Sequence, residues 1–150
     1  MKKSMKILSL VLVLVMAVLS LASCSKYNAL KSAFEKEGYE ENSNLETVAK
    51  NIKEEMEKDN LVVNLHLMTK KSNGLTSALI IEFQSTEDMK KAYDDSETIK
   101  GLVKDISSNE DAKAFQQALE NAGYAKGNCF VVPLSLLYIN EITNIVKSVK

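Results

Sequence analysis

The sequence contains no arginine and no tryptophan, and it has only one histidine, one proline and two cysteines. Without arginine the chain lacks the planar guanidinium group that binds phosphate and guanine at two points, and its lysines alternate with carboxylates. These features argue against nucleic acid as a partner. Hydrolytic triads and zinc sites generally need histidine, and His66 alone cannot form a cluster. We therefore predict that His66 is a strand residue that is hydrogen-bonded or faces solvent.

Familiar catalytic and ligand-binding motifs are also absent. The sequence has no Gly-x-Ser-x-Gly, Walker loop, His-Glu-x-x-His or glycine-rich dinucleotide loop. Residues 105–111 place oxygen donors at alternate positions, as a calcium loop does. However, Glu110 stands where that loop needs glycine, and Gln116 stands where it needs a bidentate glutamate, so a helix cap is the better interpretation. The sequence thus predicts no catalytic, metal-binding or cofactor-binding residue, and no cofactor.

The strongest signal lies in the first 24 residues. Lysines at positions 2, 3 and 6 precede an apolar run over residues 7–21, which closes on Leu21-Ala22-Ser23-Cys24. A basic start, an apolar run of this length and small residues at its end are typical of a secretory leader. The closing tetrapeptide resembles the lipobox of bacterial lipoproteins, whose cysteine receives diacylglycerol before the leader is cut. The resemblance implies that residues 1–23 are a cleaved signal peptide and that Cys24 is the site of lipid attachment.

Two other interpretations of the leader stay open. Ordinary cleavage after Ala22 would release the domain, whereas an uncleaved anchor is disfavoured because the apolar run is shorter than the ~20 residues of a spanning helix. In all three cases the lysine-rich end stays inside, so the rest of the chain lies outside the cytoplasm. With a lipid on Cys24, the chain would be anchored to the outer face of the bacterial cell membrane. A diacylglyceryl group carries two acyl chains, and two chains hold where one binds only reversibly.

Residues 24–150 have the size of one ordinary domain with a single core. Removal of the leader takes away three of the 19 lysines and none of the 20 acidic residues, so the mature domain has a formal charge of −4. No polybasic cluster lies beside the anchor, and the lipid would therefore supply the membrane affinity. An acylated Cys24 leaves Cys129 without a disulfide partner, so the domain must fold without a covalent staple. Cys129 begins a short apolar run and suits a buried strand better than a reactive or metal-binding thiol.

Hydrophobic periodicity predicts an α+β fold in the order ααββααβα. A two-residue period predicts strands over 61–68 and 75–83, joined by a tight turn at Asn73-Gly74, and a third strand over 128–132 ends at Pro133. Helical spacing predicts helices over 27–38, 44–56, 86–106, 107–122 and 138–149, with a polar loop at 40–44 and an open break point at Ser96. The five tyrosines lie at helical spacing or just after a helix-ending glycine, which favours core or rim packing.

A right-handed crossover after the hairpin most simply places the third strand beside the first and antiparallel to it. The sequence therefore predicts a small, three-stranded, mainly antiparallel sheet with helices packed on one face. It does not indicate an oligomeric state.

The sequence predicts a durable lipid anchor and shows no set of catalytic residues. Together these observations favour a membrane-anchored extracytoplasmic lipoprotein that is a non-enzymatic binding or accessory domain. The expected partners are the membrane, through the diacylglyceryl anchor, and an envelope protein or peptide. A small envelope enzyme that uses carboxylates or Cys129 is the first alternative, and it predicts a pocket that holds these groups. A structural or spacer lipoprotein with no specific ligand is the second alternative.

Overall fold

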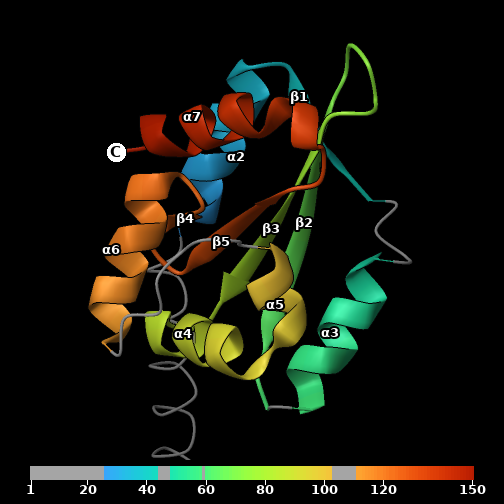
Figure 1. Cartoon of the computed structure of the whole chain (residues 1–150). Coiled ribbons are helices and arrows are strands. Elements are labelled where there is room, and N and C mark those ends of the chain that lie inside the picture. Colours follow the sequence, from blue (N-terminus) through green and yellow to red (C-terminus); the bar gives the residue numbers. More distant parts are fainter. Residues whose placement is uncertain (1–25, 44–47, 59, 103–110) are drawn as a thin grey trace, which may run out of the picture.

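The computed structural model describes residues 26–43, 48–58, 60–102 and 111–150, so the leader and Cys24 lie outside the described part of the chain. Helices and strands are mixed along the chain, which confirms the α+β class (Figure 1). The elements are α2 (Tyr27–Lys36), β1 (Tyr39–Asn42), α3 (Val48–Lys58), β2 (Val63–Lys70), β3 (Ser77–Phe83), α4 (Thr86–Asp95), α5 (Glu97–Leu102), α6 (Ala112–Ala122), β4 (Ala125–Lys126), β5 (Cys129–Pro133), the 3-10 helix η1 (Leu136–Tyr138) and α7 (Ile139–Ser148).

The sheet has five strands in the described residues, not the three that the sequence predicted. Their order is β1-β2-β3-β5-β4, and every neighbouring pair is antiparallel. The prediction that the third strand lies beside the first is wrong, because β5 pairs with β3. All but two residues of β3 are buried, as expected of a strand covered on both faces, and it therefore lies in the centre of the sheet. β2 carries Asn64 and His66 on one face and lies nearer the edge.

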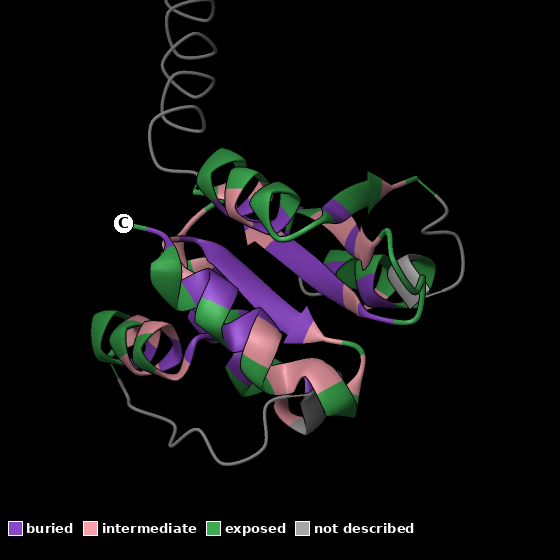
Figure 2. Ribbon diagram, turned by 90° about the horizontal axis from the view of Figure 1, so that it is seen from above, coloured by how far each residue is buried: buried purple, intermediate pink, exposed green. Residues whose placement is uncertain are grey.

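Helices cover both faces of the sheet, which corrects the prediction of one covered face. One core packs α3, α4, α5 and α6 against side chains such as Leu79 and Ile81, whereas the other packs α2 and α7 against Ala78 and Ile80. Alternate residues of β3 thus contribute to opposite cores. The views agree: α2 and α7 lie on one side of the strands in Figure 1, and the central strands are buried in Figure 2. The sheet is the middle layer of three.

One predicted helix start, at Ser85, is confirmed in detail. The Ser85 hydroxyl accepts a hydrogen bond from the Asp88 amide at 3.0 Å and caps α4, and the Asp111 carboxylate caps α6 in the same way through the Lys113 amide at 3.0 Å. The sequence predicted the start of this helix at residue 107, and residues 103–110 lie outside the described residues. The helix predicted over 86–106 breaks at Ser96, whose hydroxyl accepts a hydrogen bond from the Ile99 amide.

The hairpin between β2 and β3 is present, but its turn is longer than predicted. Residues 71–76 form a loop in which the Asn73 side chain accepts hydrogen bonds from the amides of Leu75 (3.2 Å) and Thr76 (3.1 Å). Gly74 has a positive φ of 62°, and Asn73 does not have a positive φ. A tight type I′ turn needs positive φ at both positions and therefore does not form. As a result Leu75, predicted to lie in a strand, is 82% exposed.

Candidate functional site

Of the residues that the sequence singled out, the structure describes Cys129 and His66 but not the predicted lipid site. Cys24 precedes the described residues, so the structure does not bear on its lipidation. Cys129 is fully buried in β5, which confirms its prediction as a strand residue of the core. His66 of β2 is hydrogen-bonded, as predicted, to Glu41 of β1 and Glu82 of β3, and it belongs to a polar cluster that the sequence did not reveal.

Strand register builds this cluster on the sheet face beneath α2. Glu41 pairs with Met68 across the β1–β2 ladder, and Asn64 pairs with Glu82 across the β2–β3 ladder. Because alternate residues share a face, Glu41, His66 and Glu82 lie on the same side of three adjacent strands. We call Tyr27, Lys31, Glu41, His66 and Glu82 the histidine cluster.

The imidazole of His66 lies between two carboxylates and beneath an aromatic ring. Its Nδ1 atom is 3.0 Å from Oε1 of Glu41, and its Nε2 atom is 3.3 Å from Oε2 of Glu82. The ring of Tyr27, the first residue of α2, stacks on it with the ring centroids 3.5 Å apart and an interplanar angle of 15°. Only 17% of the His66 side chain is exposed. An imidazole held on three sides in this way has little freedom to move.

Lys31 and Tyr27, the other two members of the histidine cluster, both interact with Glu41. Nζ of Lys31 donates a hydrogen bond to Glu41 at 2.6 Å. This bond, followed by the one from His66, lowers the pKa of Glu41 to about 2, so Glu41 stays ionised at any physiological pH. Burial and the interaction with Glu41 raise the pKa of Tyr27 above its ordinary range. Tyr27 therefore stays neutral.

A second polar group ties α7 to the outer strands. The Glu141 carboxylate in α7 accepts hydrogen bonds from Lys70 in β2 and from the Tyr39 hydroxyl in β1, the latter at 2.8 Å. The bond from Lys70 is the main cause of a lowered Glu141 pKa. A lowered pKa keeps this carboxylate ionised at neutral pH, which suits a structural clamp and not a general acid.

Neither polar group has the geometry of a metal or catalytic centre. Across the described ranges, no three His, Cys, Asp or Glu side chains are placed to hold a metal ion. Among the carboxylates that the structure describes, those of Glu41 and Glu141 have a shifted pKa, and both are shifted downwards. Neither carboxylate is therefore suited to act as a general acid. A separate apolar space beneath α4, α5 and α6 has no room for a water-sized molecule, so it is a packing gap of the core.

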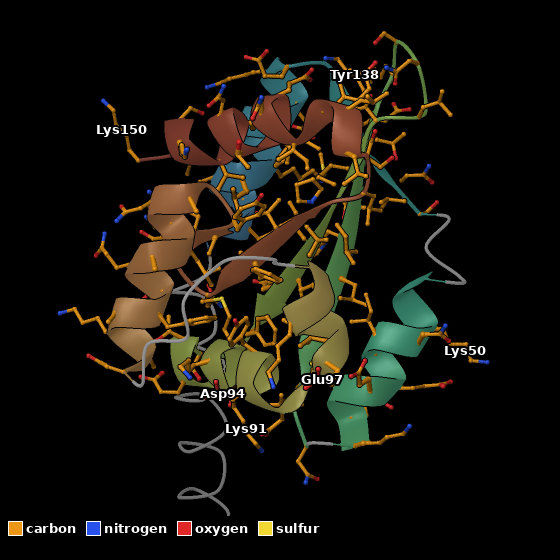
Figure 3. The ribbon with its side chains drawn as sticks, viewed as in Figure 1. Lys50, Lys91, Asp94, Glu97, Tyr138 and Lys150 are labelled. Carbon is orange, nitrogen blue, oxygen red and sulfur yellow. The ribbon has the colours of Figure 1, made fainter. Side chains whose placement is uncertain are left out.

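Among the described residues, the three most exposed large apolar side chains, those of Leu75, Leu136 and Leu137, lie in two neighbouring segments. The first is the loop of residues 71–76 between β2 and β3, and the second is residues 134–138, which join β5 to α7 and include η1. The Leu134 amide donates to the Ser77 carbonyl at 2.9 Å, and the Asn73 amide group donates to the Tyr138 hydroxyl at 3.5 Å. Figure 3 shows Tyr138 at the same end of the molecule as the hairpin loop, with Asp94 and Glu97 at the other end.

These two segments carry four exposed leucines, which we call the leucine patch. Their exposed fractions are 82% for Leu75, 43% for Leu134, 86% for Leu136 and 89% for Leu137. This surface was not expected, because the sequence predicted a strand at Leu75 and an apolar helix stripe that begins at Tyr138. The available signal was the run Pro133-Leu134-Ser135-Leu136-Leu137, which fits neither a strand period nor that stripe.

Comparisons of the chain with protein-family models, curated proteins and solved structures give no significant match. Within the part of the chain that the structure covers, no helix has both the length and the hydropathy needed to cross a membrane.

Proposed function

We propose that this protein is a lipid-anchored extracytoplasmic lipoprotein whose domain binds a protein partner in the cell envelope and performs no chemistry. In this proposal residues 1–23 are removed, Cys24 carries the diacylglyceryl anchor, and the domain lies at the outer face of the membrane. The leader sequence supports the anchor, and the leucine patch supports the binding role.

The leucine patch is the observation that carries the binding role. Three of its side chains are more than 80% exposed, although each could contribute about 1.5–3 kcal/mol if it were buried. Contiguous apolar patches on soluble proteins commonly mark interaction sites. The domain has two well-filled hydrophobic cores, so the lack of a core does not explain why these leucines are exposed. A partner that covers them would recover the free energy of their burial.

The shape and charge of the patch favour a protein pocket as its occupant. Leu136 and Leu137 protrude, and protruding side chains fit a concave apolar pocket. The neighbouring lysines are already balanced, because Lys70 pairs with Glu141 and Lys71 pairs with Glu40 at 3.7 Å. Attraction to an anionic bilayer needs unbalanced basic groups beside the apolar residues. We therefore assign the patch to a neutral apolar pocket on an envelope protein.

The described side chains give the enzyme alternative no support. The Cys129 side chain has no exposed surface, and a nucleophilic thiol needs access and a thiolate-stabilising neighbourhood. The carboxylates whose pKa is shifted are held ionised by lysines, whereas a general acid needs a raised pKa.

Site-specific photo-crosslinking in living cells tests the binding role. With p-benzoylphenylalanine in place of Leu136, we expect an adduct of one discrete mass with an envelope protein. The same probe at Val62, 63% exposed and at the opposite end of β2 from the hairpin, is the matched control and should give little of that adduct. Leu75→Ser together with Leu137→Ser should lower the adduct yield about tenfold, since hot-spot residues carry most of the binding energy.

The fold should be unaffected by these two exposed substitutions, with a change in the free energy of unfolding within about 0.5 kcal/mol. Adducts with lipid alone would contradict the choice of a protein partner. If the Leu75→Ser and Leu137→Ser substitutions leave the yield of a protein adduct unchanged, the leucine patch is not the binding surface. The absence of any adduct would favour the spacer alternative.

A further inference from the structure

One side chain contacts both segments of the leucine patch. The side-chain amide of Asn73 bonds to residues of its own loop and to Tyr138 of the second segment. We propose that Asn73 is the positioning residue of the leucine patch: it orders the loop of residues 71–76, ties this loop to residues 134–138, and so keeps the patch rigid before a partner binds. This proposal deepens the proposed function, and it rests on that function only for the partner.

The oxygen of the Asn73 side chain orders the backbone that carries Leu75. Oδ1 accepts hydrogen bonds from the amides of Leu75 at 3.2 Å and of Thr76 at 3.1 Å. The orientation of the side-chain amide follows from these neighbours, because backbone amides only donate and so face the oxygen. Thr76 is fully buried, so without Oδ1 water cannot replace the lost acceptor at its amide. The shape of the loop therefore depends on this oxygen.

The nitrogen of the same side chain faces two hydroxyl groups. Nδ2 donates to Oγ1 of Thr76 at 3.0 Å and to the hydroxyl of Tyr138 at 3.5 Å. It carries two hydrogens, so it can donate to both hydroxyls at once. The second distance is the outer limit of a hydrogen bond, and this bond is the weaker of the two. The Tyr138 ring packs against the core between α2, α7 and the sheet, which holds its hydroxyl within reach of Asn73.

Residues 136–137, which carry the two most exposed leucines of the patch, are tied to the hairpin on both sides. The Leu134 amide, which precedes them, donates to the Ser77 carbonyl at 2.9 Å. Tyr138, which follows them, accepts the hydrogen bond from Asn73. With alanine at position 73 the second tie is lost, whereas the first stays. The two segments of the patch can then change their relative position.

Backbone order matters for this surface because the leucine side chains have little packing of their own. Their exposed fractions reach 89%, so contacts with the domain do little to position them. A mobile loop loses conformational freedom when a partner binds, and that loss weakens the complex. A patch that is ordered in advance avoids the loss. We therefore expect the partner to dock on a preformed surface, with little movement of the backbone.

Backbone ¹⁵N relaxation of the full-length protein in detergent micelles tests the positioning role without any partner. For the unmodified protein we expect order parameters of about 0.85 at the amides of Leu75 and Leu137, as in rigid backbone. Asn73→Ala should lower the value at Leu75 below about 0.6, the flexible range, and should also lower the value at Leu137. Asn73 does not have a positive φ, so the substitution does not change backbone strain.

Two further variants separate the two parts of this role. Asn73→Asp keeps an oxygen for both backbone amides, and its carboxylate can accept from the hydroxyls of Thr76 and Tyr138, so both order parameters should stay near those of the unmodified protein. Tyr138→Phe removes only the tie, and it should lower the value at Leu137 but not at Leu75. A fall at Leu75 alone in Asn73→Ala, or mobile leucines in the unmodified protein, would overturn the positioning role.

The crosslinking assay with the probe at Leu136 tests whether the order of the patch matters for binding. Asn73→Ala should lower the adduct yield about fivefold, as expected for the loss of one or two neutral hydrogen bonds. Ser85→Ala is the matched control, because it removes the acceptor of a backbone amide at the opposite end of β3 and should leave the yield unchanged. An unchanged yield in Asn73→Ala would overturn the proposal. If the unmodified protein gives no adduct, the proposed function is contradicted instead, and the relaxation experiment still decides the role of Asn73.

Discussion

Gly123→Ala is expected to lower the free energy of unfolding by about 3 kcal/mol. Gly123 ends α6 with a φ of +84°, a region that costs other residues about 1–2 kcal/mol. A Cβ atom there would lie 2.6 Å from the Thr143 carbonyl oxygen and 2.8 Å from the Thr143 Cβ atom. α7 would have to move away from α6, and forced repacking of this kind typically costs 1–3 kcal/mol.

Gly38→Ala is the matched control for this prediction. Gly38 has nearly the same φ, +83°, but a Cβ atom added to it would meet nothing within 4 Å. We expect Gly38→Ala to lower the free energy of unfolding only by the backbone cost of about 1–2 kcal/mol. Urea denaturation of both variants measures the difference. Equal losses would contradict the close approach of α6 to α7.

Phe34→Ala should destabilise the domain by about 3–5 kcal/mol, the usual range for a phenylalanine removed from a core. Phe34 lies in α2, is fully buried, and packs edge-on against Tyr39 with ring centroids 5.2 Å apart. It belongs to the core between α2, α7 and the sheet, whereas Phe115 belongs to the core on the opposite face. Phe115→Ala should therefore cost about as much.

The comparison of these two variants tests whether the sheet is covered on both faces. A loss below about 1 kcal/mol for Phe34→Ala, beside a full loss for Phe115→Ala, would mean that only one face carries a core. Leu137→Ala, at an 89% exposed position, should change the free energy of unfolding by no more than about 0.5 kcal/mol and calibrates the measurement.

Local patterns were sufficient to predict much of this fold. The cap at Ser85, the helix ends at Gly38 and Gly123 and the end of a strand at Pro133 each depend on a few neighbouring residues, and each is present. Ile142, Ile145 and Val146 of the predicted apolar stripe are buried in α7, and Val149 is buried directly after it. These features could be predicted because their physical causes lie within one turn of helix or one strand.

The parts of the sheet that the sequence did not predict depend on contacts between residues that are distant in sequence. β1 has the sequence Tyr-Glu-Glu-Asn, whose last three residues are polar, as suits a short edge strand, so it was predicted as a loop. β4 has two residues and is too short to show a period. The position of β5 beside β3 follows from which strands can be buried on both faces, and no local pattern encodes this choice.

The histidine cluster illustrates the same limit at the level of a site. The prediction that His66 is hydrogen-bonded was correct, but its partners Glu41 and Glu82 lie 25 and 16 residues away in sequence. Only the register of β1, β2 and β3 brings them together. The leucine patch likewise needs two loops that are adjacent only in the folded chain.

The measurement that tests the central claim most directly is the intact mass of the native protein, combined with membrane fractionation. Proteins with Cys24→Ala and Cys129→Ala would be analysed beside it, and the buried Cys129 is the matched control because these are the only two cysteines. We predict a diacylated mature protein that begins at Cys24 and stays with the membrane, unchanged by Cys129→Ala and lost in Cys24→Ala. A lipid-free protein that begins at Ser23 and accumulates in the medium would contradict the account.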